Sequence, residues 1–301
     1  MQRLILAMLA AVLCASSAFA GDEADQPLRY EHVMVPVKHG FFTVHLSTYL
    51  YTPPGPGPFP LVVLNHGKAP GGTHQPDTKF IWQAKKFLAR GYAVLVPNRE
   101  GIANSGGTYF HGCDVESAAR HWADSVEVAI DYARTLPFID ARRIVVIGQS
   151  QGGIATVALG ERNLPGVLGI VNFAGGSREE KCGGWQDGLV DDYKAFGADS
   201  RVPALFLYGD NDSYWGGGTL SKRFFEAYHA GNPNSAYFDE GTFADGDSHM
   251  FFHHASGYET WAPTLWKFFD SLGLNSQVLP DDEKAIEAAN AEQLFEKPVE
   301  K

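Results

Sequence analysis

The apolar residues of this chain gather into short uninterrupted runs that alternate with segments of helical spacing. The runs occupy residues 61–64, 92–96, 144–147, 167–173, 204–208 and 236–238. A strand that helices cover on both faces has no polar face, so such runs are typical of a parallel sheet. We therefore expect an α/β fold with a mostly parallel central sheet and helices on both faces. Residues 31–37 and 42–51, joined at His39-Gly40, predict an antiparallel N-terminal hairpin.

Two of the intervening helices can be predicted in detail. The first begins near residue 78, where Asp77 or Thr78 is expected to cap it, and Gly91 supplies a left-handed stop. The second runs from about residue 116 and ends before Pro137. Its apolar face comprises Ala119, Trp122, Val126, Ala129, Ile130 and Ala133.

Two segments depart from the alternation. Residues 175–201 are rich in glycine and charge, and we expect either a cap over the carboxyl edge of the sheet or an irregular surface loop. Beyond residue 278 the chain becomes polar, which predicts a peripheral helix or a tail. The organisation expected is one domain over residues 21–277 followed by the segment 278–301.

The first twenty residues have the layout of a cleaved secretory signal. Arg3 precedes an uncharged apolar stretch, and the small residues around Ala20 end it. We expect cleavage after Ala20, and hence a secreted or periplasmic protein; lipidation at Cys14 is a weaker alternative. The two remaining cysteines, Cys113 and Cys182, can form one disulfide in an oxidising compartment, the alternative being two free thiols.

Composition and charge limit the partners. The 301 residues are 45% hydrophobic, enough for a substantial core, and the formal net charge is −11 at pH 7. No basic field exists to attract phosphates, so we expect neither a nucleic-acid partner nor binding to an anionic membrane surface. The apolar segment at the N-terminus is too short for a membrane span. A small molecule remains the expected partner, and the sequence leaves the oligomeric state open.

The most informative stretch is Gly148-Gln149-Ser150-Gln151-Gly152, which follows an apolar strand and precedes a helix. A serine hydroxyl is a weak nucleophile and must be exposed to a base and to substrate. A sharp turn from strand to helix exposes it, and glycines two residues to either side leave room for that turn. Ser150 is therefore the predicted nucleophile.

The base and the acid are expected later in the chain. Asp212 follows the strand at residues 204–208 and is favoured as the acid over Asp210, which is expected to shape the turn. His249 precedes the last helix of the fold and is favoured as the base over His253 and His254. Clustered histidines also raise the question of a metal, but no zinc-ligand spacing accompanies them.

Two backbone N–H groups are expected to bind the oxyanion of the transition state. One belongs to Gln151, at the start of the helix after the nucleophile. The other belongs to Lys68, in the loop that follows an early strand. In that loop His66 precedes Gly67, whose missing side chain lets the backbone approach.

These motifs together resemble the α/β-hydrolase superfamily, and within it the dienelactone hydrolase-like and carboxylesterase branch. The likeness covers residues 30–272 and keeps the order nucleophile, acid, histidine. Arg99-Glu100-Gly101 resembles a loop that closes one wall of the site in such enzymes. Dienelactone hydrolases have a cysteine nucleophile, whereas Ser150 stands here, so the resemblance implies a serine esterase with the α/β-hydrolase fold.

The sequence thus predicts a serine hydrolase that cleaves a small carboxylic ester through an acyl-enzyme, with no cofactor and no metal. Aromatic residues expected at the substrate pocket are Trp185, Tyr214, Trp215 and Phe110, with Tyr109 beside the last. An amidase or peptidase of the same fold is the first alternative. A binding protein with an inactive hydrolase fold, or a structural protein of the envelope, is less favoured.

Overall fold

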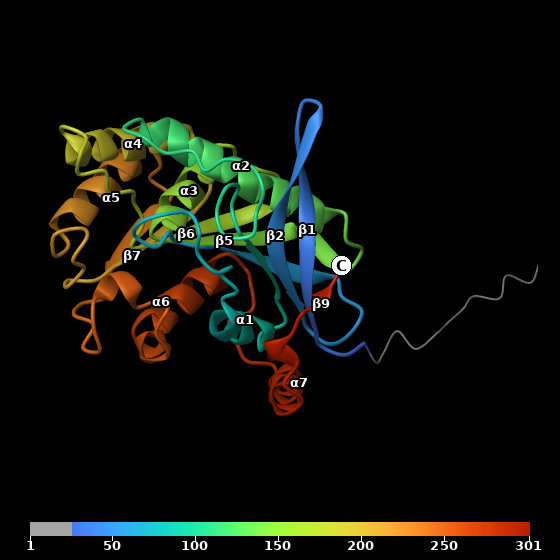
Figure 1. The fold of residues 1–301 in the computed structure, drawn as a ribbon. Helices are drawn as coiled ribbons and strands as arrows, with labels where there is room; N and C mark the ends of the chain where they lie inside the picture. The colour runs from blue at the N-terminus through green and yellow to red at the C-terminus, as the bar shows by residue number, and fades with distance from the viewer. Residues whose placement is uncertain (1–25) are drawn as a thin grey trace, which may run out of the picture.

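A computed structural model describes residues 26–301, so the predicted signal at residues 1–20 lies outside the described residues. Its centre is a nine-stranded sheet in the order β8-β7-β6-β5-β3-β4-β2-β1-β9. The strands from β3 to β8 are parallel, whereas β1 and β2 form an antiparallel hairpin whose second strand pairs antiparallel with β4. The predicted α/β fold is therefore confirmed (Figure 1).

The elements follow one another in the alternation that the apolar runs predict. In chain order they are β1 (Arg29–His39), β2 (Phe42–Thr52), β3 (Phe59–Asn65), α1 (Ile81–Leu88), β4 (Ala93–Pro97), α2 (Val115–Arg134), β5 (Ile139–Gln149), α3 (Gln151–Gly160), β6 (Val167–Phe173), α4 (Trp185–Asp199), β7 (Ala204–Tyr208), α5 (Thr219–Gly231), β8 (Ser235–Asp239), α6 (Tyr258–Ser271), α7 (Pro280–Ala291) and β9 (Val299–Glu300). None of the helices between residues 26 and 301 is long and apolar enough to cross a bilayer.

The helices form a layer on each face of the sheet. One core cluster joins the sheet to α2, α3, α4 and α5, and the other joins it to α1, α6 and α7. Val146 packs in the first cluster and its neighbour Val145 in the second, because successive side chains of a strand point to opposite faces. β5 is buried on both faces from Ile144 to Gln149, the stretch that leads into the serine.

The first helix begins later than the sequence predicts. Neither Asp77 nor Thr78 caps it: α1 starts at Ile81, after Phe80 in a left-handed conformation with φ of 49°. The Asp77 carboxylate accepts hydrogen bonds elsewhere, from Ser47 Oγ at 2.5 Å, Tyr49 Oη at 2.9 Å and the Asn104 N–H at 3.0 Å. These partners come from β2 and from the loop after β4, so tertiary contacts override the local capping preference.

Residues 175–201 are neither a cap nor an irregular loop along most of their length, which corrects the sequence-based expectation. Residues 185–199 form α4, an ordinary crossover helix between β6 and β7, and bury Leu189, Tyr193 and Phe196. The glycines at 184, 188 and 197 hide the helical pattern in the sequence. Gly197 has a packing reason, because a Cβ there would lie 2.2 Å from the Tyr228 carbonyl oxygen on α5.

The C-terminal segment forms a helix and a short strand. α7 contributes Ile286 and Ala289 to the core beside α1. After it, β9 pairs in parallel with residues 31 and 32 of β1. The end of the chain therefore lies beside the N-terminal hairpin (Figure 1).

One buried carboxylate on α4 is expected to make stability depend on pH. Burial, together with the nearby carboxylates of Glu116, Asp114 and Asp191, raises the pKa of Asp192 to about 7. Between the ordinary pKa of an aspartate and this raised value, the folded state binds the proton more tightly than the unfolded chain does. Folding stability is therefore lost as pH rises through this window.

Replacing Asp192 by asparagine should remove that loss. We expect the Asp192→Asn variant to be more stable than the parent at pH 8 by about 1–3 kcal/mol, and equally stable near pH 4. Thermal unfolding followed by circular dichroism at both pH values measures the difference. Asp199→Asn, at an exposed position of the same helix whose carboxylate does not contribute to the pKa of Asp192, is the matched control and should change little. An equal gain at both pH values would point to packing instead of charge.

Candidate active site

Ser150 stands at a strained turn between β5 and α3. Its backbone has φ of 55° and ψ of −122°, a conformation that residues other than glycine rarely adopt. The Ser150 N–H donates to the Phe173 carbonyl oxygen at 2.9 Å, and its own carbonyl accepts from the Gly176 N–H at 3.1 Å. The end of β6 thus holds the turn, and the serine is presented at the carboxyl edge of the sheet.

The glycines around the serine are required by close packing. A Cβ at Gly148 would lie 2.0 Å from the Gly152 carbonyl oxygen, and a Cβ at Gly152 would lie 2.1 Å from the Asn65 carbonyl oxygen. A side chain at Gly148 would push α3 away from β5, and one at Gly152 would push α3 away from β3. The glycines two residues before and after Ser150 are therefore explained by two close contacts, one between Gly148 and Gly152 and one between Gly152 and β3.

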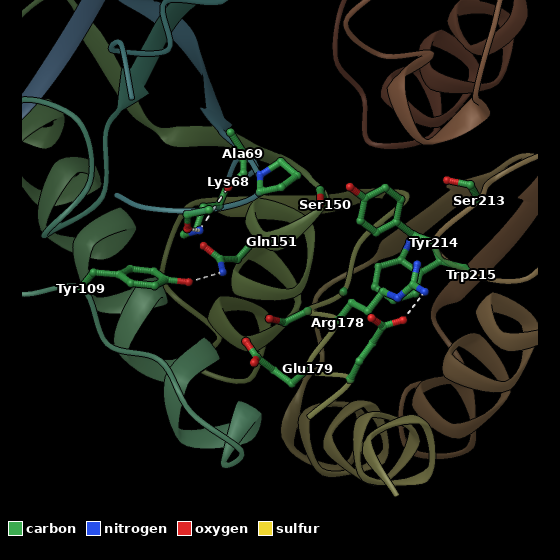
Figure 2. A pocket seen from close by; sticks show the side chains of 15 residues that line it. Lys68, Ala69, Tyr109, Ser150, Gln151, Arg178, Glu179, Ser213, Tyr214 and Trp215 are labelled. Carbon is green, nitrogen blue, oxygen red and sulfur yellow. Dashed lines mark hydrogen bonds and ion pairs between the residues drawn. The ribbon is translucent and has the colours of Figure 1, made fainter. Parts of the chain in front are cut away.

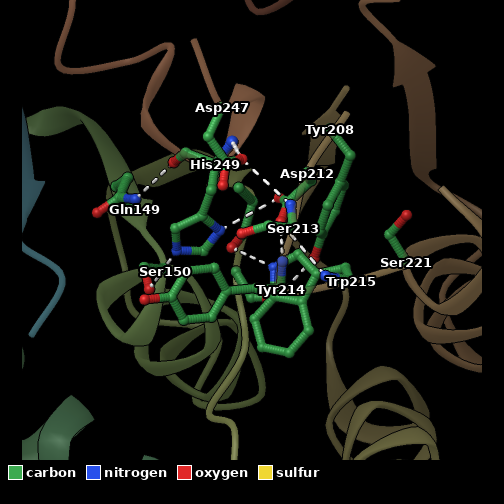
Figure 3. A network of polar contacts seen from close by, with 12 residues as sticks. Gln149, Ser150, Tyr208, Asp212, Ser213, Tyr214, Trp215, Ser221, Asp247 and His249 are labelled. Atoms are coloured by element: carbon green, nitrogen blue, oxygen red, sulfur yellow. Dashed lines mark hydrogen bonds and ion pairs between the residues drawn. The ribbon is translucent and has the colours of Figure 1, made fainter. Parts of the chain in front are cut away.

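The structure brings Ser150, His249 and Asp212 into one hydrogen-bonded chain (Figure 3). Ser150 Oγ lies 3.0 Å from His249 Nε2, and His249 Nδ1 lies 3.2 Å from Asp212 Oδ2. Asp212 is 2% exposed, and its other oxygen accepts the N–H groups of Tyr214 at 2.9 Å and Trp215 at 3.3 Å. Because the carboxylate accepts the Nδ1 proton, Nε2 is free to accept the proton of Ser150.

The residues considered as alternative acid and bases, Asp210, His253 and His254, lie outside this hydrogen-bonded chain. Asp210 is exposed and no hydrogen bond joins it to His249. His253 bonds Gln149, and His254 is exposed; neither reaches Ser150. Across residues 26–301, no three His, Cys, Asp or Glu side chains are grouped as metal ligands would be.

Gln149, the residue before the serine, ties His249 to the turn that carries Ser150. Its side chain is 3% exposed and donates from Nε2 to the His249 carbonyl oxygen at 2.9 Å. Its Oε1 lies 3.2 Å from His253 Nε2. Burial lowers the pKa of His253 to about 4, so its ring is neutral and donates the Nε2 proton. Sequence reasoning did not identify this role, because residues 149 and 253 are far apart in the chain.

We expect a Gln149→Met variant to lose about tenfold in kcat with little change in KM, because His249 loses the hydrogen bond that holds its backbone. Steady-state kinetics on a soluble ester measure the loss. Gln83→Met is the matched control: Gln83 is also buried and donates to a carbonyl, that of Phe252, at 2.8 Å. If both variants lost kcat equally, general loosening of the loop would account for the effect.

The loop after β3 lies against the serine. A Cβ at Gly67 would come within 3.1 Å of Ser150 Cβ and 2.5 Å of Gln149 Oε1, so only glycine allows this approach. His66 fixes the loop: Nε2 accepts the Arg99 N–H at 3.2 Å, and Nδ1 donates to the Gly67 carbonyl at 2.6 Å. Burial holds the pKa of His66 well below its usual range, so the ring stays neutral in this arrangement.

The two backbone donors predicted for the oxyanion are both unengaged. Within the described part of the chain, no acceptor bonds the N–H of Lys68 or the N–H of Gln151. Gln151 is the first residue of α3, so its N–H also has no partner inside the helix. Two free donors near Ser150 are what a developing oxyanion requires.

Arg99 connects the two segments that carry these donors. Its side chain is fully buried and donates to Asn65 Oδ1 at 2.5 Å, to the His66 carbonyl oxygen, and to Gln151 Oε1 at 3.0 Å. Burial lowers the pKa of Arg99 to about 10, so the guanidinium remains charged at neutral pH. Arg99 therefore lies beneath the site and ties the loop after β3 to α3; it does not form an outer wall.

A pocket of about 540 Å³ opens over Ser150 (Figure 2). Tyr214 and Trp215 line it, as does Tyr109, whose hydroxyl accepts from Gln151 Nε2 at 2.6 Å. Phe110 and Trp185, two of the predicted lining residues, do not line this pocket. Phe110 is 46% exposed because the chain turns its neighbour Tyr109 inward, and Trp185 lines the adjoining hollows at the start of α4.

A disulfide between Cys113 and Cys182 joins two walls of the pocket. Cys113 closes the loop that carries Tyr109, and Cys182 follows the lining segment of residues 176–180. The bond spans 69 residues of sequence. The disulfide predicted from the cysteine count is therefore present, and it fixes the distance between the two sides of the pocket.

Comparison with known proteins gives a partial match to a peptidase family. The sequence model of the prolyl oligopeptidase family matches residues 78–164. The quorum-quenching protein AidA of Acinetobacter baumannii is 33% identical over 135 residues, which are 44% of this chain and 42% of AidA. The match thus spans less than half the length of that relative.

Solved structures match over more of the chain. The esterase Pf2001 of Pyrococcus furiosus superposes with a TM-score of 0.58 at 16% identity, over 81% of this chain and 93% of the esterase. A Klebsiella pneumoniae protein assigned as a dienelactone hydrolase superposes with a TM-score of 0.55 at 17% identity, over 80% of this chain and 98% of that protein. At these identities the likeness establishes the fold.

Proposed function

The chain has the α/β-hydrolase fold, and on this premise we propose that it is a serine hydrolase that cleaves carboxylic esters through an acyl-enzyme on Ser150. The observation that carries the proposal is the hydrogen-bonded chain from Ser150 through His249 to Asp212, at 3.0 Å and 3.2 Å. It lies beside two unengaged backbone donors and opens into a pocket. A nucleophile, a base, an orienting acid and an oxyanion site are the four parts that acyl transfer requires.

In the proposed mechanism, His249 Nε2 takes the proton of Ser150 as Oγ attacks the ester carbonyl carbon. The carbonyl oxygen becomes the oxyanion and accepts hydrogen bonds from the N–H groups of Gln151 and Lys68. His249 then gives its proton to the leaving alcohol as the C–O bond breaks. Water, deprotonated by His249, attacks the acyl-enzyme in the same way, and Ser150 is released with its proton.

Asp212 acts through the histidine. Its carboxylate accepts the Nδ1 proton and stabilises the imidazolium that forms after the first proton transfer. Tyr214 stacks on the imidazole with ring centroids 4.1 Å apart and an angle of 20°, which limits rotation of the ring. The contacts of Asp212 and Tyr214 support the proposal that His249 stays aligned with Ser150 during both formation and hydrolysis of the acyl-enzyme. No step of the mechanism calls for a cofactor.

The proposed substrate is a small ester that fits a pocket with both aromatic and charged walls. Tyr109, Tyr214 and Trp215 supply aromatic contacts, and Lys68 and Glu179 supply charges. We further propose that the protein acts outside the cytoplasm, in a secreted or periplasmic form. The disulfide between Cys113 and Cys182 is compatible with that location.

A peptidase or amidase is the second candidate function, and the match of residues 78–164 to the prolyl oligopeptidase family favours it. The same triad and oxyanion site would serve an amide, with His249 protonating a leaving amine. The two candidates differ in the substrate accepted and not in the catalytic residues. A direct comparison of substrates is therefore needed.

The experiment uses p-nitrophenyl esters from acetate to laurate, together with matched p-nitroanilides of the same acids. Labelling with a fluorophosphonate and mass spectrometry of the labelled peptide identify the nucleophile. We expect label on Ser150 and faster turnover of esters, with the preferred chain length reporting the size of the acyl site. Faster turnover of anilides would favour the peptidase, and folded protein with neither label nor turnover would contradict both.

A further inference from the structure

The N-terminal hairpin extends well beyond the rest of the sheet. β1 and β2 pair along their whole length, from Arg29↔Thr52 to His39↔Phe42. Their other neighbours end early: β4 pairs with β2 only from Thr48 to Tyr51, and β9 pairs with β1 only at residues 31 and 32. The end of the hairpin, residues 38–43, therefore reaches beyond its neighbouring strands and is exposed, as the blue ribbon in Figure 1 shows.

Two adjacent phenylalanines occupy the tip of this hairpin. Phe41 has a relative exposure of 105% and Phe42 of 78%, the two largest among the exposed apolar side chains of the described residues. They follow Gly40, whose φ of 59° makes the turn. Neither belongs to a core cluster, whereas Val33, Val35, Val37 and Leu46 further down the hairpin do. The two rings at the tip therefore do not contribute to the hydrophobic core. A pair of adjacent exposed apolar rings indicates an interaction site.

The charge of the hairpin differs from that of the protein. The chain as a whole carries a formal charge of −11, yet it contains no Asp or Glu from residue 32 to residue 76. Lys38, His39 and His45 are exposed near the tip. The nearest carboxylate bonded to this part of the hairpin, Glu100, accepts from His39 Nε2 at 2.8 Å. Lys38 is therefore the charged side chain beside the two rings, and the hairpin from residue 32 onward has no carboxylate of its own to oppose it. This local charge, unlike that of the whole chain, suits an anionic surface.

The edge of the hairpin is unsuited to pairing with a strand of another protein. β1 lies at the edge of the sheet beyond residue 32. Pro36 removes one backbone donor from that edge, and Lys38 places a charge on it. Both features disfavour a continuous sheet between two copies of the chain. The tip with its two phenylalanines is then the part of the hairpin left for an apolar interaction. A lipid bilayer can receive two such rings without a preformed pocket.

We propose that the hairpin tip, residues 38–43, is a peripheral lipid anchor that inserts Phe41 and Phe42 into the headgroup region of an anionic membrane. Lys38 contributes electrostatic attraction to the acidic headgroups, as juxtamembrane lysines do. Two rings bury little area, so the association is weak and reversible. This anchor does not depend on the proposed catalytic activity.

The anchor is connected to the pocket side of the molecule. Thr48 of β2 pairs with Pro97, the last residue of β4, so the hairpin leaves the sheet at the carboxyl edge that also carries Ser150. The Gly106 N–H donates to the His45 carbonyl oxygen at 2.8 Å. Gly106 belongs to the loop after β4, whose later residue Tyr109 lines the pocket. Binding at the tip would therefore place the carboxyl edge of the sheet, where Ser150 lies, on the membrane side of the protein.

Cosedimentation with sucrose-loaded vesicles tests the anchor. One set of vesicles contains phosphatidylglycerol in phosphatidylethanolamine, and the other contains phosphatidylcholine alone. We expect the parent chain to sediment with the anionic vesicles, and a Phe41→Ser/Phe42→Ser double variant to bind at least about tenfold more weakly. Lys38→Glu should weaken binding to the anionic vesicles only. All chains share residues 1–25, so any contribution of that segment cancels in the comparison.

Met34→Ser is the matched control, because Met34 is also exposed on the hairpin, at 41%, but lies away from the tip. It should bind as the parent does. Unchanged thermal unfolding and unchanged hydrolysis of a soluble ester would show that the double variant is folded. Absence of vesicle binding by the parent, or equal binding by the double variant, would overturn the proposal. A dimer in analytical ultracentrifugation that the double variant disperses, without vesicle binding, would overturn it too and assign the tip to self-association.

Discussion

Replacement of Ser150 by alanine is expected to lower kcat by about 10⁶-fold while the protein remains folded. The hydroxyl lies 3.0 Å from His249 Nε2 and is the atom that would form the acyl-enzyme, so its removal leaves only binding and the backbone donors. Alanine has the same backbone requirement at φ of 55° as serine does, so the turn is kept. Steady-state kinetics on p-nitrophenyl acetate measure the loss.

The control for this substitution is Ser213→Ala. Ser213 lines the same pocket, and its N–H, which the substitution keeps, donates to Asp247 Oδ1 at 3.1 Å. We expect this variant to retain most activity and to accept the fluorophosphonate label, whereas Ser150→Ala should accept none. Circular dichroism of both variants checks folding. Substantial turnover by a folded Ser150→Ala variant would show that another group is the nucleophile.

Replacement of Asp212 by asparagine is expected to lower kcat by about 10⁴-fold. Asp212 Oδ1 is held by the N–H groups of Tyr214 and Trp215, so the carbonyl oxygen of an asparagine would take that place. Its NH₂ group would then face His249 Nδ1 and donate to it. The histidine would carry its proton on Nε2 and could not accept the proton of Ser150. The pH dependence of kcat/KM, measured beside the parent, reports the change in the histidine.

Two other aspartates serve as controls for Asp212. Asp210→Asn should be nearly silent, because that carboxylate is exposed and makes no contact with the histidine. Asp247→Asn should have an intermediate effect of about tenfold, because Asp247 Oδ1 accepts the backbone N–H of His249 at 2.9 Å and so positions it. Full activity of Asp212→Asn, with loss of activity in Asp210→Asn, would assign the acid to Asp210.

The continuous apolar runs predicted the strands of the sheet well, because a strand that is covered on both faces needs apolar side chains at every position. The runs at residues 167–173 and 204–208 coincide with β6 and β7. The candidate site also followed from local patterns: Ser150 and Asp212 come after buried apolar strands, and His249 lies in the segment between β8 and α6. The carboxyl ends of parallel strands share one edge, which brings these segments together. Helix α4 was missed because glycines at 184, 188 and 197 interrupt its pattern.

The sequence by itself thus determined the alternation of strands and helices, the strained serine turn and the residues expected at the carboxyl edge. All of these depend on neighbours within a few positions of the chain. Tertiary structure alone decided between Asp212 and Asp210 as the partner of His249. It also decided the roles of Arg99 and of the hydrogen bonds that join Gln149 to His249 and His253. These roles rest on contacts between distant residues, which only the packed chain brings within hydrogen-bonding distance.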